Sequence, residues 1–331
     1  MANTWILHDY ASPHYNGFFI QHDPLLLIAG FASVARRTFR PKIQYFPMPE
    51  RENWFIPDFT CSHLPRNSFM RKSKTLKKLR EGQIVHICSM GHYLPPYAQV
   101  AADVGFDCVW LDLEHRTLAI AELQSLLTGF HLHDIDCLLR PATREKASLC
   151  RFLEDGATGL MFPHVASADE ARRIVNMVKF PPVGDRGLNF ASFDADFKMG
   201  GVTVESYVEH TNRETFVVAQ IETPDALACA GEIASVDGID ALFVGLGDLG
   251  LRLQHDKRQL EEAITTVAVQ AKNSGKPWGC PVADESSTAR RTEQGAQLLA
   301  IGSDFQAMHL QLVRWKKSLD AGIENAKIPP D

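Results

Sequence analysis

The chain has 331 residues, of which 45% are hydrophobic, and a formal net charge of -6 at pH 7. This length allows one large domain or two smaller ones, and the mild acidity argues against a nucleic-acid-binding surface. The seven cysteines show no C-x-x-C spacing and lie mostly in apolar runs, which favours free thiols in a reducing compartment. Because no segment reaches the apolar length of a membrane span, we expect a cytoplasmic protein without a membrane partner.

The first 69 residues differ in character from the rest. They are rich in aromatic residues, His and Pro and show no clear hydrophobic period. We expect residues 1–69 to form an N-terminal extension, either weakly ordered or packed as an arm on the barrel or on a neighbouring subunit, and Met70 is an alternative biological start. The basic stretch Arg71–Arg80 contains Leu76 and Leu79, which favours the solvated face of a short helix over a polyanion site.

From Gln83 onward, short apolar runs alternate with helical patterns. Each run is bounded by Gly, Pro or Asp and is too continuously apolar for a one-sided antiparallel strand. The eight runs are IVHICSM, CVWLDLE, DCLLRP, GLMFPHV, FVVAQIE, ALFVGLG, PWGCPV and LLAIGS. The clearest helical segments are Ile120–Leu132, Arg144–Glu154, Ala168–Lys179, Pro224–Ala234, Lys257–Ser274 and Ser287–Gln294. This alternation predicts an α/β fold, a (β/α)8 TIM barrel over residues 70–331.

Local signals mark several helix ends. Ser167-x-x-Glu170 matches a capping box, and Thr223 followed by Pro224 suits an N-cap and a first helical turn. Gly275 suits a helix end. The connection between the fourth and fifth runs is too long for a simple barrel loop and holds an additional helical stretch, Val204–Thr211. Such an excursion is typical of an active-site or interface loop.

Four polar residues lie where an apolar run changes into a loop. They are His115, Arg140, Glu222 and Asp248. In a (β/α)8 barrel the carboxyl ends of all strands meet at one rim, and that rim carries the chemistry. An imidazole, a guanidinium and two carboxylates at one rim therefore indicate an enzyme.

Glu222 and Asp248 form the most specific pair of the four. Two carboxylates from neighbouring strand ends can hold a hard divalent cation and leave positions for water and substrate oxygens, which is typical of Mg²⁺ or Mn²⁺. The alternative is that each carboxylate only faces a helix N-terminus, since Glu222 precedes TPDAL and Asp248 precedes LGLRL.

Arg140 and His115 supply the remaining candidate groups. A guanidinium at the end of LLRP suits a carboxylate or enolate oxygen, and the alternative is a structural salt bridge to Asp112 or Glu114. His115 follows Asp112 by three residues, so that carboxylate can orient one ring nitrogen and leave the other for proton transfer. A structural histidine would fit this spacing equally well.

Gly245 and Gly247 expose backbone N–H groups beside Asp248. Such groups can receive a substrate carboxylate, as anion nests do. The chain contains no G-x-G-x-x-G, Walker or G-x-S-x-G sequence. The glycines therefore favour a carboxylate site over a dinucleotide site.

Several motifs occur together in a recognisable order. They are GFDCVWLDLEH, LLRP, EDGATGLMFPHVASADEARRIVNMVKFPPVGDRG, QIETPDAL, VDGIDALFVGLGDL and AIGSD. Between about Lys74 and Lys317 the chain resembles the HpcH/HpaI aldolase family, the metal-dependent class II pyruvate aldolases of the phosphoenolpyruvate/pyruvate barrel superfamily. The family's Gly-Pro-x-Asp-Leu-Ser reads GLGDLG here, which puts the pocket wall and the aldehyde partner in doubt more than the core chemistry.

The resemblance implies a role for each candidate residue. Glu222 and Asp248 bind the metal, Arg140 contacts the pyruvate oxygens, and Asp112 forms a dyad with His115. Gln220 matches a polar position beside the metal. The implied substrate-binding residues are Arg140, Gln220, Gly245, Leu246 and Gly247.

The implied reaction is the reversible cleavage of a 4-hydroxy-2-oxo acid, of the 2-keto-3-deoxy sugar acid type, to pyruvate and an aldehyde through a pyruvate enolate. The implied cofactor is a divalent cation, Mg²⁺ first, with Mn²⁺ or Co²⁺ as alternatives. We expect a homo-oligomer, a hexamer by resemblance. Two other functions stay open: an oxaloacetate decarboxylase or related carbon–carbon lyase on the same site, and a barrel that binds a 2-oxo acid without turnover.

Overall fold

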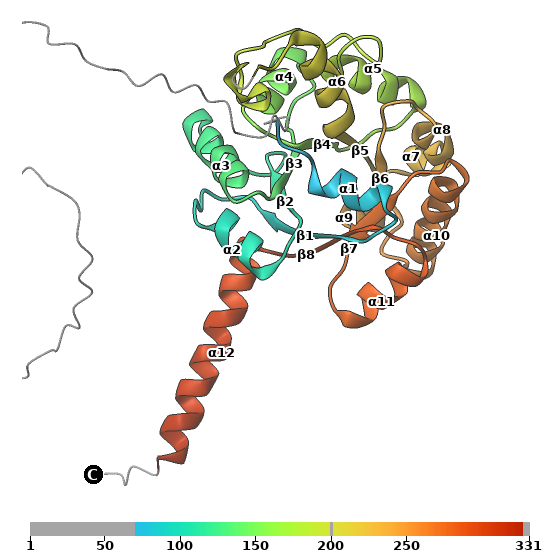
Figure 1. The fold of residues 1–331 in the computed structure, drawn as a ribbon. Helices are drawn as coiled ribbons and strands as arrows, with labels where there is room; N and C mark the ends of the chain where they lie inside the picture. Colours follow the sequence, from blue (N-terminus) through green and yellow to red (C-terminus); the bar gives the residue numbers. More distant parts are fainter. Residues whose placement is uncertain (1–69, 199–200, 327–331) are drawn as a thin grey trace, which may run out of the picture. The chain divides into compact units, whose positions relative to one another are not determined.

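The computed structural model describes residues 70–198 and 201–326, and the expected extension, residues 1–69, lies outside them. The described residues form a closed barrel of parallel strands in sequence order, β1 to β8 (Figure 1). The predicted α/β barrel is therefore confirmed, and each predicted apolar run contains one strand. The strands are β1 Val85–Met90, β2 Cys108–Asp112, β3 Asp136–Arg140, β4 Gly159–Phe162, β5 Phe216–Ile221, β6 Ala241–Val244, β7 Trp278–Pro281 and β8 Leu298–Ser303.

Helices alternate with these strands and surround the barrel (Figure 1). The predicted segments are confirmed with small shifts at their ends, and the segment Pro224–Ala234 divides at Cys229 into two helices. The helices are α1 Lys74–Arg80, α2 Tyr97–Val104, α3 Ile120–Leu132, α4 Lys146–Glu154, α5 Ala168–Val178, α6 Val204–Glu214, α7 Pro224–Ala228, α8 Ala230–Ala234, α9 Leu246–Arg252, α10 Lys257–Asn273, α11 Glu285–Glu293 and α12 Asp304–Asn325, with a 3-10 segment, η1, at Phe193–Lys198.

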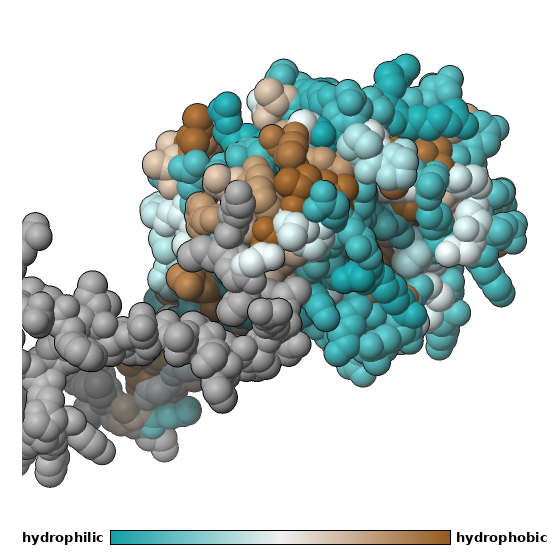
Figure 2. Space-filling model, turned by 45° about the horizontal axis from the view of Figure 1, so that its top comes forward, coloured by the Kyte–Doolittle hydropathy of each residue, from teal (hydrophilic) through white to brown (hydrophobic). Residues whose placement is uncertain are grey.

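Apolar side chains pack in two layers, one inside the barrel and one between strands and helices. The amino-terminal end of the barrel is closed by α1, whose Leu76 and Leu79 join the interior cluster. The basic side chains of this helix lie outward, and Lys78 pairs with Asp107 at 2.7 Å, so the predicted solvated face is confirmed. One face of the molecule is mostly hydrophilic, with hydrophobic patches between the polar side chains (Figure 2).

The predicted helix signals hold with one change. The Ser167 hydroxyl accepts the Glu170 N–H at 3.2 Å, but the Glu170 carboxylate accepts the N–H of Ala166 instead of closing the box on Ser167. Thr223 caps α7 with Pro224 in its first turn. Gly275, which follows α10, has a φ of +64°, the left-handed conformation in which glycine is least strained.

The long excursion between β4 and β5 folds at the amino-terminal end of the barrel. The ring of Phe193, in η1, lies against Gly156, just before β4, where a Cβ would come within 2.8 Å of it. Arg186 is buried, pairs with Asp194 at 2.8 Å and lies over the Phe180 ring. Because this end is opposite the predicted rim, the excursion does not border the site of its own chain, and the interface alternative stays a prediction.

Two further expectations concern the described residues as a whole. The six cysteines among them are free thiols, and five of these are buried. Over the same part of the chain, no helix combines the length and the apolar character needed to cross a membrane.

Candidate active site

The predicted site residues gather at the carboxyl-terminal rim of the barrel. Asp112 ends β2 and Arg140 ends β3. Glu222 directly follows β5, and Asp248 lies in the first turn of α9, after β6. His115 lies in the loop after β2. The rim arrangement that the strand ends predict is therefore present in the fold.

Two carboxylates and an indole ring hold the Arg140 side chain. Its Nε lies 2.9 Å from Asp112 Oδ1, and its Nη2 lies 2.8 Å from Asp112 Oδ2. Its Nη1 lies 3.0 Å from Glu114 Oε2, and its guanidinium carbon lies 4.7 Å from the centre of the Trp110 ring. Burial alone would raise the pKa of Asp112, but the hydrogen bonds and charge of Arg140 outweigh burial and lower it.

His115 does not form the expected ring contact with Asp112. The Asp112 carboxylate accepts the backbone N–H of Glu114 and, at 3.5 Å, that of His115, while both of its oxygens contact Arg140. The carboxylate nearest the His115 ring is Glu114, 3.6 Å from Nε2, and the His115 side chain is 56% exposed. Asp112 and Arg140 are paired in the register of β2 and β3, so the Asp112 carboxylate contacts Arg140. The His115 imidazole therefore stays exposed and lies near Glu114.

Glu222 is buried and is bonded on both carboxylate oxygens. Its Oε1 accepts the backbone N–H of His164 at 2.7 Å, and its Oε2 accepts the side-chain amide of Gln220 at 2.6 Å. Burial raises the pKa of Glu222, and the negative charges of Glu114 and Asp248 raise it further, against the opposing effect of His164. Such a concentration of negative charge suits a bound cation.

The first turn of α9 lies close to Glu222. A Cβ at Gly245 would lie 2.3 Å from Glu222 Oε2 and 2.8 Å from Gln220 Nε2, so only glycine leaves room for these side chains. Leu246 and Gly247 begin the helix, where the N–H groups lack intrahelical partners. The expected free N–H of Gly245 is not available, because it donates to the Ile221 carbonyl at 3.0 Å. Asp248 also pairs with Arg252 at 2.9 Å. The alternative that the carboxylate only faces a helix N-terminus fits Asp248, which lies in the first turn of α9. It does not fit Glu222, which precedes Thr223, the N-cap of α7.

The donor set fits a hard divalent cation that keeps several waters. Within residues 70–198 and 201–326, no group of three or more His, Cys, Asp or Glu side chains forms a ready metal cage. Magnesium is commonly held by one or two carboxylates together with water and substrate oxygens, which Glu222 and Asp248 can provide. Gln220 Oε1 is a further oxygen, since it is buried and has no hydrogen-bond partner among the described residues.

Sequence reasoning missed His164 and named Glu114 only in the alternative of a structural salt bridge from Arg140 to Asp112 or Glu114, and the structure forms both salt bridges. Glu114 contacts Arg140 and lies 3.6 Å from ring nitrogens of both His115 and His164. The His164 ring also approaches Glu222, with Nδ1 3.2 Å from Oε1. A signal for His164 was present, because it is a polar residue near the end of the fourth apolar run, two residues after β4.

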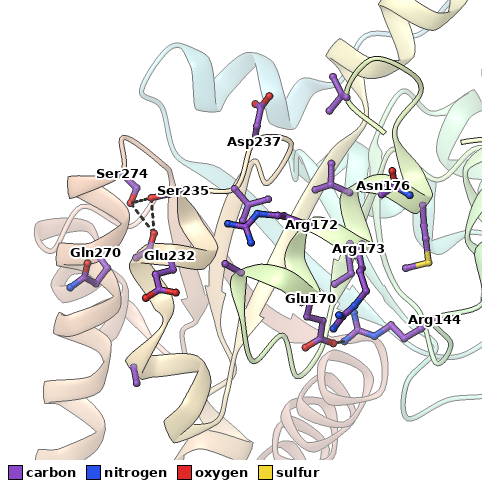
Figure 3. A pocket seen from close by; sticks show the side chains of 18 residues that line it. Arg144, Glu170, Arg172, Arg173, Asn176, Glu232, Ser235, Asp237, Gln270 and Ser274 are labelled. Carbon is purple, nitrogen blue, oxygen red and sulfur yellow. Dashed lines mark hydrogen bonds and ion pairs between the residues drawn. The ribbon is translucent and has the colours of Figure 1, made fainter. Parts of the chain in front are cut away.

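A large groove lies elsewhere, on the outer face of the barrel. It has a volume of about 1560 Å³ and lies between α5 on one side and α8 and α10 on the other. Figure 3 shows its polar lining, which includes Arg172, Asn176, Glu232 and Ser274. None of the predicted site residues lines it, so the size of a groove does not locate the chemistry in this fold.

Comparison with known proteins identifies the family. Residues 93–309 match the family model "HpcH/HpaI aldolase/citrate lyase". The chain is 31% identical over 247 residues to a pyruvate aldolase of Rhizobium etli, covering 73% of this chain and 93% of that protein. It is 31% identical over 213 residues to a 4-hydroxy-2-oxo-heptane-1,7-dioate aldolase of Salmonella heidelberg, covering 62% of this chain and 79% of that protein.

A solved structure supports the same relationship. The HpcH/HpaI aldolase of Desulfitobacterium hafniense is 29% identical, with a TM-score of 0.69, and the match covers 77% of this chain and 96% of that chain. It extends the similarity from the motifs to the arrangement of the whole barrel. The chain belongs to the HpcH/HpaI aldolase/citrate lyase family and is a carbon–carbon lyase.

Proposed function

We propose that this protein is a divalent-metal-dependent aldolase that cleaves a 4-hydroxy-2-oxo acid reversibly to pyruvate and an aldehyde. The observation that carries the proposal is the position of the Arg140 guanidinium and of the Glu222 and Asp248 carboxylates at the same rim of the barrel. The activities named for the two relatives, on pyruvate and on a 4-hydroxy-2-oxo acid, support the same reaction class.

Glu222 and Asp248 would hold the cation, and Gln220 lies beside them. When bound, the cation supplies a Lewis acid to the carboxylate and keto oxygens of a 2-oxo acid. Arg140 donates N–H groups to the oxygen that gains charge as the C3–C4 bond breaks, which stabilises the enolate. A guanidinium has five N–H donors, and the contacts to Asp112 and Glu114 engage three of them, so donors remain for a substrate oxygen.

His115 moves the proton of the 4-hydroxyl group, directly or through water. Its exposed imidazole is accessible from the mouth of the barrel, and its nearest carboxylate is Glu114. The backbone N–H groups of Leu246 and Gly247 receive the substrate carboxylate at the start of α9, because the Gly245 N–H already donates to the Ile221 carbonyl at 3.0 Å. In this proposal Asp112 acts on Arg140 and not on the His115 ring.

The closest alternative is decarboxylation of oxaloacetate, because it forms the same pyruvate enolate and would use the same residues. Assays with a panel of 4-hydroxy-2-oxo acids and with oxaloacetate, each with and without EDTA, separate the possibilities. Chelator-sensitive release of an aldehyde supports the aldolase. Turnover of oxaloacetate alone supports the decarboxylase, and binding of 2-oxo acids without any turnover supports a non-catalytic barrel.

We further propose a cytoplasmic homo-oligomer, a hexamer by family resemblance. The support for the oligomer comes from α12, which extends away from the barrel (Figure 1) and in which only Asp304 is buried. Exposed apolar side chains recur on it at spacings of three or four and so share one helix face. They are Phe305, Met308, Leu312, Trp315, Leu319 and Ile323. An apolar stripe of this kind is expected to pack on a second copy, and a monomeric mass in light scattering would contradict the oligomer.

A further inference from the structure

His164 contacts Glu222 through two separate nitrogen atoms. Its backbone nitrogen lies 2.7 Å from Glu222 Oε1, and its ring Nδ1 lies 3.2 Å from the same oxygen. A carboxylate oxygen has about two lone-pair positions. The backbone N–H donates to Oε1 and the ring lies beside the same oxygen, while the partner of Oε2 is the Gln220 amide at 2.6 Å.

The backbone of His164 explains how both nitrogens reach one oxygen. His164 has a φ of +53°, in the left-handed region that few non-glycine residues adopt, although His, Asn and Asp do so more often than most. Residues held in this region concentrate at functional sites, where the surrounding structure maintains them. Here the conformation brings the backbone N–H and the ring to the same side, toward Glu222.

The backbone of Gly245 packs closely against the other oxygen of the carboxylate. Gly245 has no side chain, and a Cβ there would lie 2.3 Å from Glu222 Oε2, closer than any real Cβ contact. The same Cβ would lie 2.8 Å from Gln220 Nε2, so a side chain at position 245 would displace Oε2 or the Gln220 amide. His164 therefore lies against one oxygen of Glu222, and the absence of a side chain at Gly245 lets the other oxygen keep its position.

We infer that His164 is a positioning residue, which holds Oε1 of Glu222 so that Oε2 alone is presented to a divalent cation. The inference deepens the proposed function and rests on it for the cation. His164 acts through Glu222 and not on the substrate. Residues that hold a metal ligand in this way commonly contribute about 10- to 100-fold to metal affinity.

Substitutions at position 164 distinguish the contribution of the His164 ring from that of its backbone N–H. His164→Gly keeps the backbone N–H and tolerates the positive φ, but it removes the ring. His164→Asn also tolerates this φ and restores a short side-chain donor. His255→Gly is the matched control, because His255 is exposed, has a φ of +59° and lies beyond the other end of α9.

The measurement is Mn²⁺ affinity, by electron paramagnetic resonance of the free ion, together with kcat at saturating Mn²⁺. We expect His164→Gly to weaken Mn²⁺ binding about tenfold or more, His164→Asn to recover part of the loss, and His255→Gly to bind as wild type. At saturating Mn²⁺ the kcat of His164→Gly should return to within about threefold of wild type, an effect of under about 0.7 kcal/mol.

Two results would overturn the inference. One is wild-type Mn²⁺ affinity in His164→Gly, which would show that the ring does not position Glu222. The other is a kcat that stays more than about tenfold low at saturating Mn²⁺, which would place the ring in the reaction itself. If the wild-type protein binds no Mn²⁺, the proposed metal dependence fails, and this outcome is distinct from both because it does not depend on the variants.

Discussion

Asp112 and Arg140 are partners in the register of β2 and β3 and also share two short side-chain contacts, at 2.9 and 2.8 Å. The barrel itself therefore sets the orientation of the guanidinium. Glu114 engages the third nitrogen, and the Trp110 ring lies beneath the group. An arginine held so firmly is suited to stabilise charge at one fixed position, because little reorganisation is needed during the reaction.

Replacing Arg140 by lysine should not be a mild change. Lysine keeps the charge but loses the planar fork that pairs with Asp112 and Glu114. We expect kcat for aldol cleavage to fall about 100-fold, while Arg258→Lys, at an exposed pair on α10, leaves it unchanged. Steady-state kinetics provide the check. If kcat/KM of Arg140→Lys stays within about twofold, an effect of about 0.4 kcal/mol, the arginine is only structural.

Glu222→Gln and Asp248→Asn should each abolish turnover and leave the fold intact. Both changes remove a negative charge that a hard cation requires and keep the size of the side chain. Asp225→Asn is the matched control, because Asp225 is an exposed carboxylate three residues after Glu222. Calorimetric metal titration and thermal melting test the prediction. Full activity of either variant after exhaustive chelation would contradict the metal assignment.

Gly245→Ala should impair the site without a change of charge. The added methyl group would meet Glu222 Oε2 at 2.3 Å, so this carboxylate must shift. We expect metal affinity to fall about tenfold or more. Gly250→Ala, in the same helix, meets only Leu260 Cδ2 at 3.8 Å and should bind metal normally. Equal affinities for the two variants would show that the contact at Gly245 does not constrain Glu222.

Stability should depend on pH through Glu214, at the end of α6. Burial raises its pKa, but hydrogen bonds from Arg80 and from the Ser73 N–H outweigh burial and lower the pKa below its ordinary value of 4.5. A lowered folded-state pKa gives stability that is present above the unfolded value and is lost as pH falls through the folded one. The free energy of unfolding should therefore drop less between about pH 5 and about pH 3 in Glu214→Gln than in wild type.

The check is urea unfolding across this range, with Glu205→Gln as the control, since Glu205 is exposed in the first turn of the same helix. Parallel pH profiles for wild type and Glu214→Gln would show that Glu214 does not contribute.

A chain beginning at Met70 should fold, bind metal and cleave substrate. Residues 1–66 lie outside the barrel motifs, whereas Met70 is buried in a small cluster with Phe180 and Tyr207 and should be retained. Activity and solution mass are the measurements. A soluble, correctly assembled but inactive truncation would show that the preceding residues contribute to the site.

The sequence predicted the elements better than the contacts between them. Each strand could be recognised because apolar runs end sharply at Gly, Pro or Asp, and Ile120–Leu132 matches α3 to the residue. The spacing of Asp112 and His115 predicted a side-chain contact between them that the structure does not have. The register of β2 against β3 places Asp112 beside Arg140, and the carboxylate binds that side chain instead. The place of His164 at a strand end was visible in the sequence, but its contact with Glu222 depends on a positive φ that the letters PHV do not reveal.

The closure of the barrel has a consequence for how the chain folds during synthesis. The Ser89 hydroxyl of β1 bonds the Gly302 carbonyl of β8, 213 residues later, and Val85 pairs with Leu298 in the same ladder. The ribosome must deliver β8 before β1 can obtain its second neighbour, so one edge of the nascent sheet stays open through most of translation. Contacts this far apart slow folding and leave strand edges exposed to aggregation. Chaperone dependence should therefore fall sharply once β8 has emerged from the exit tunnel.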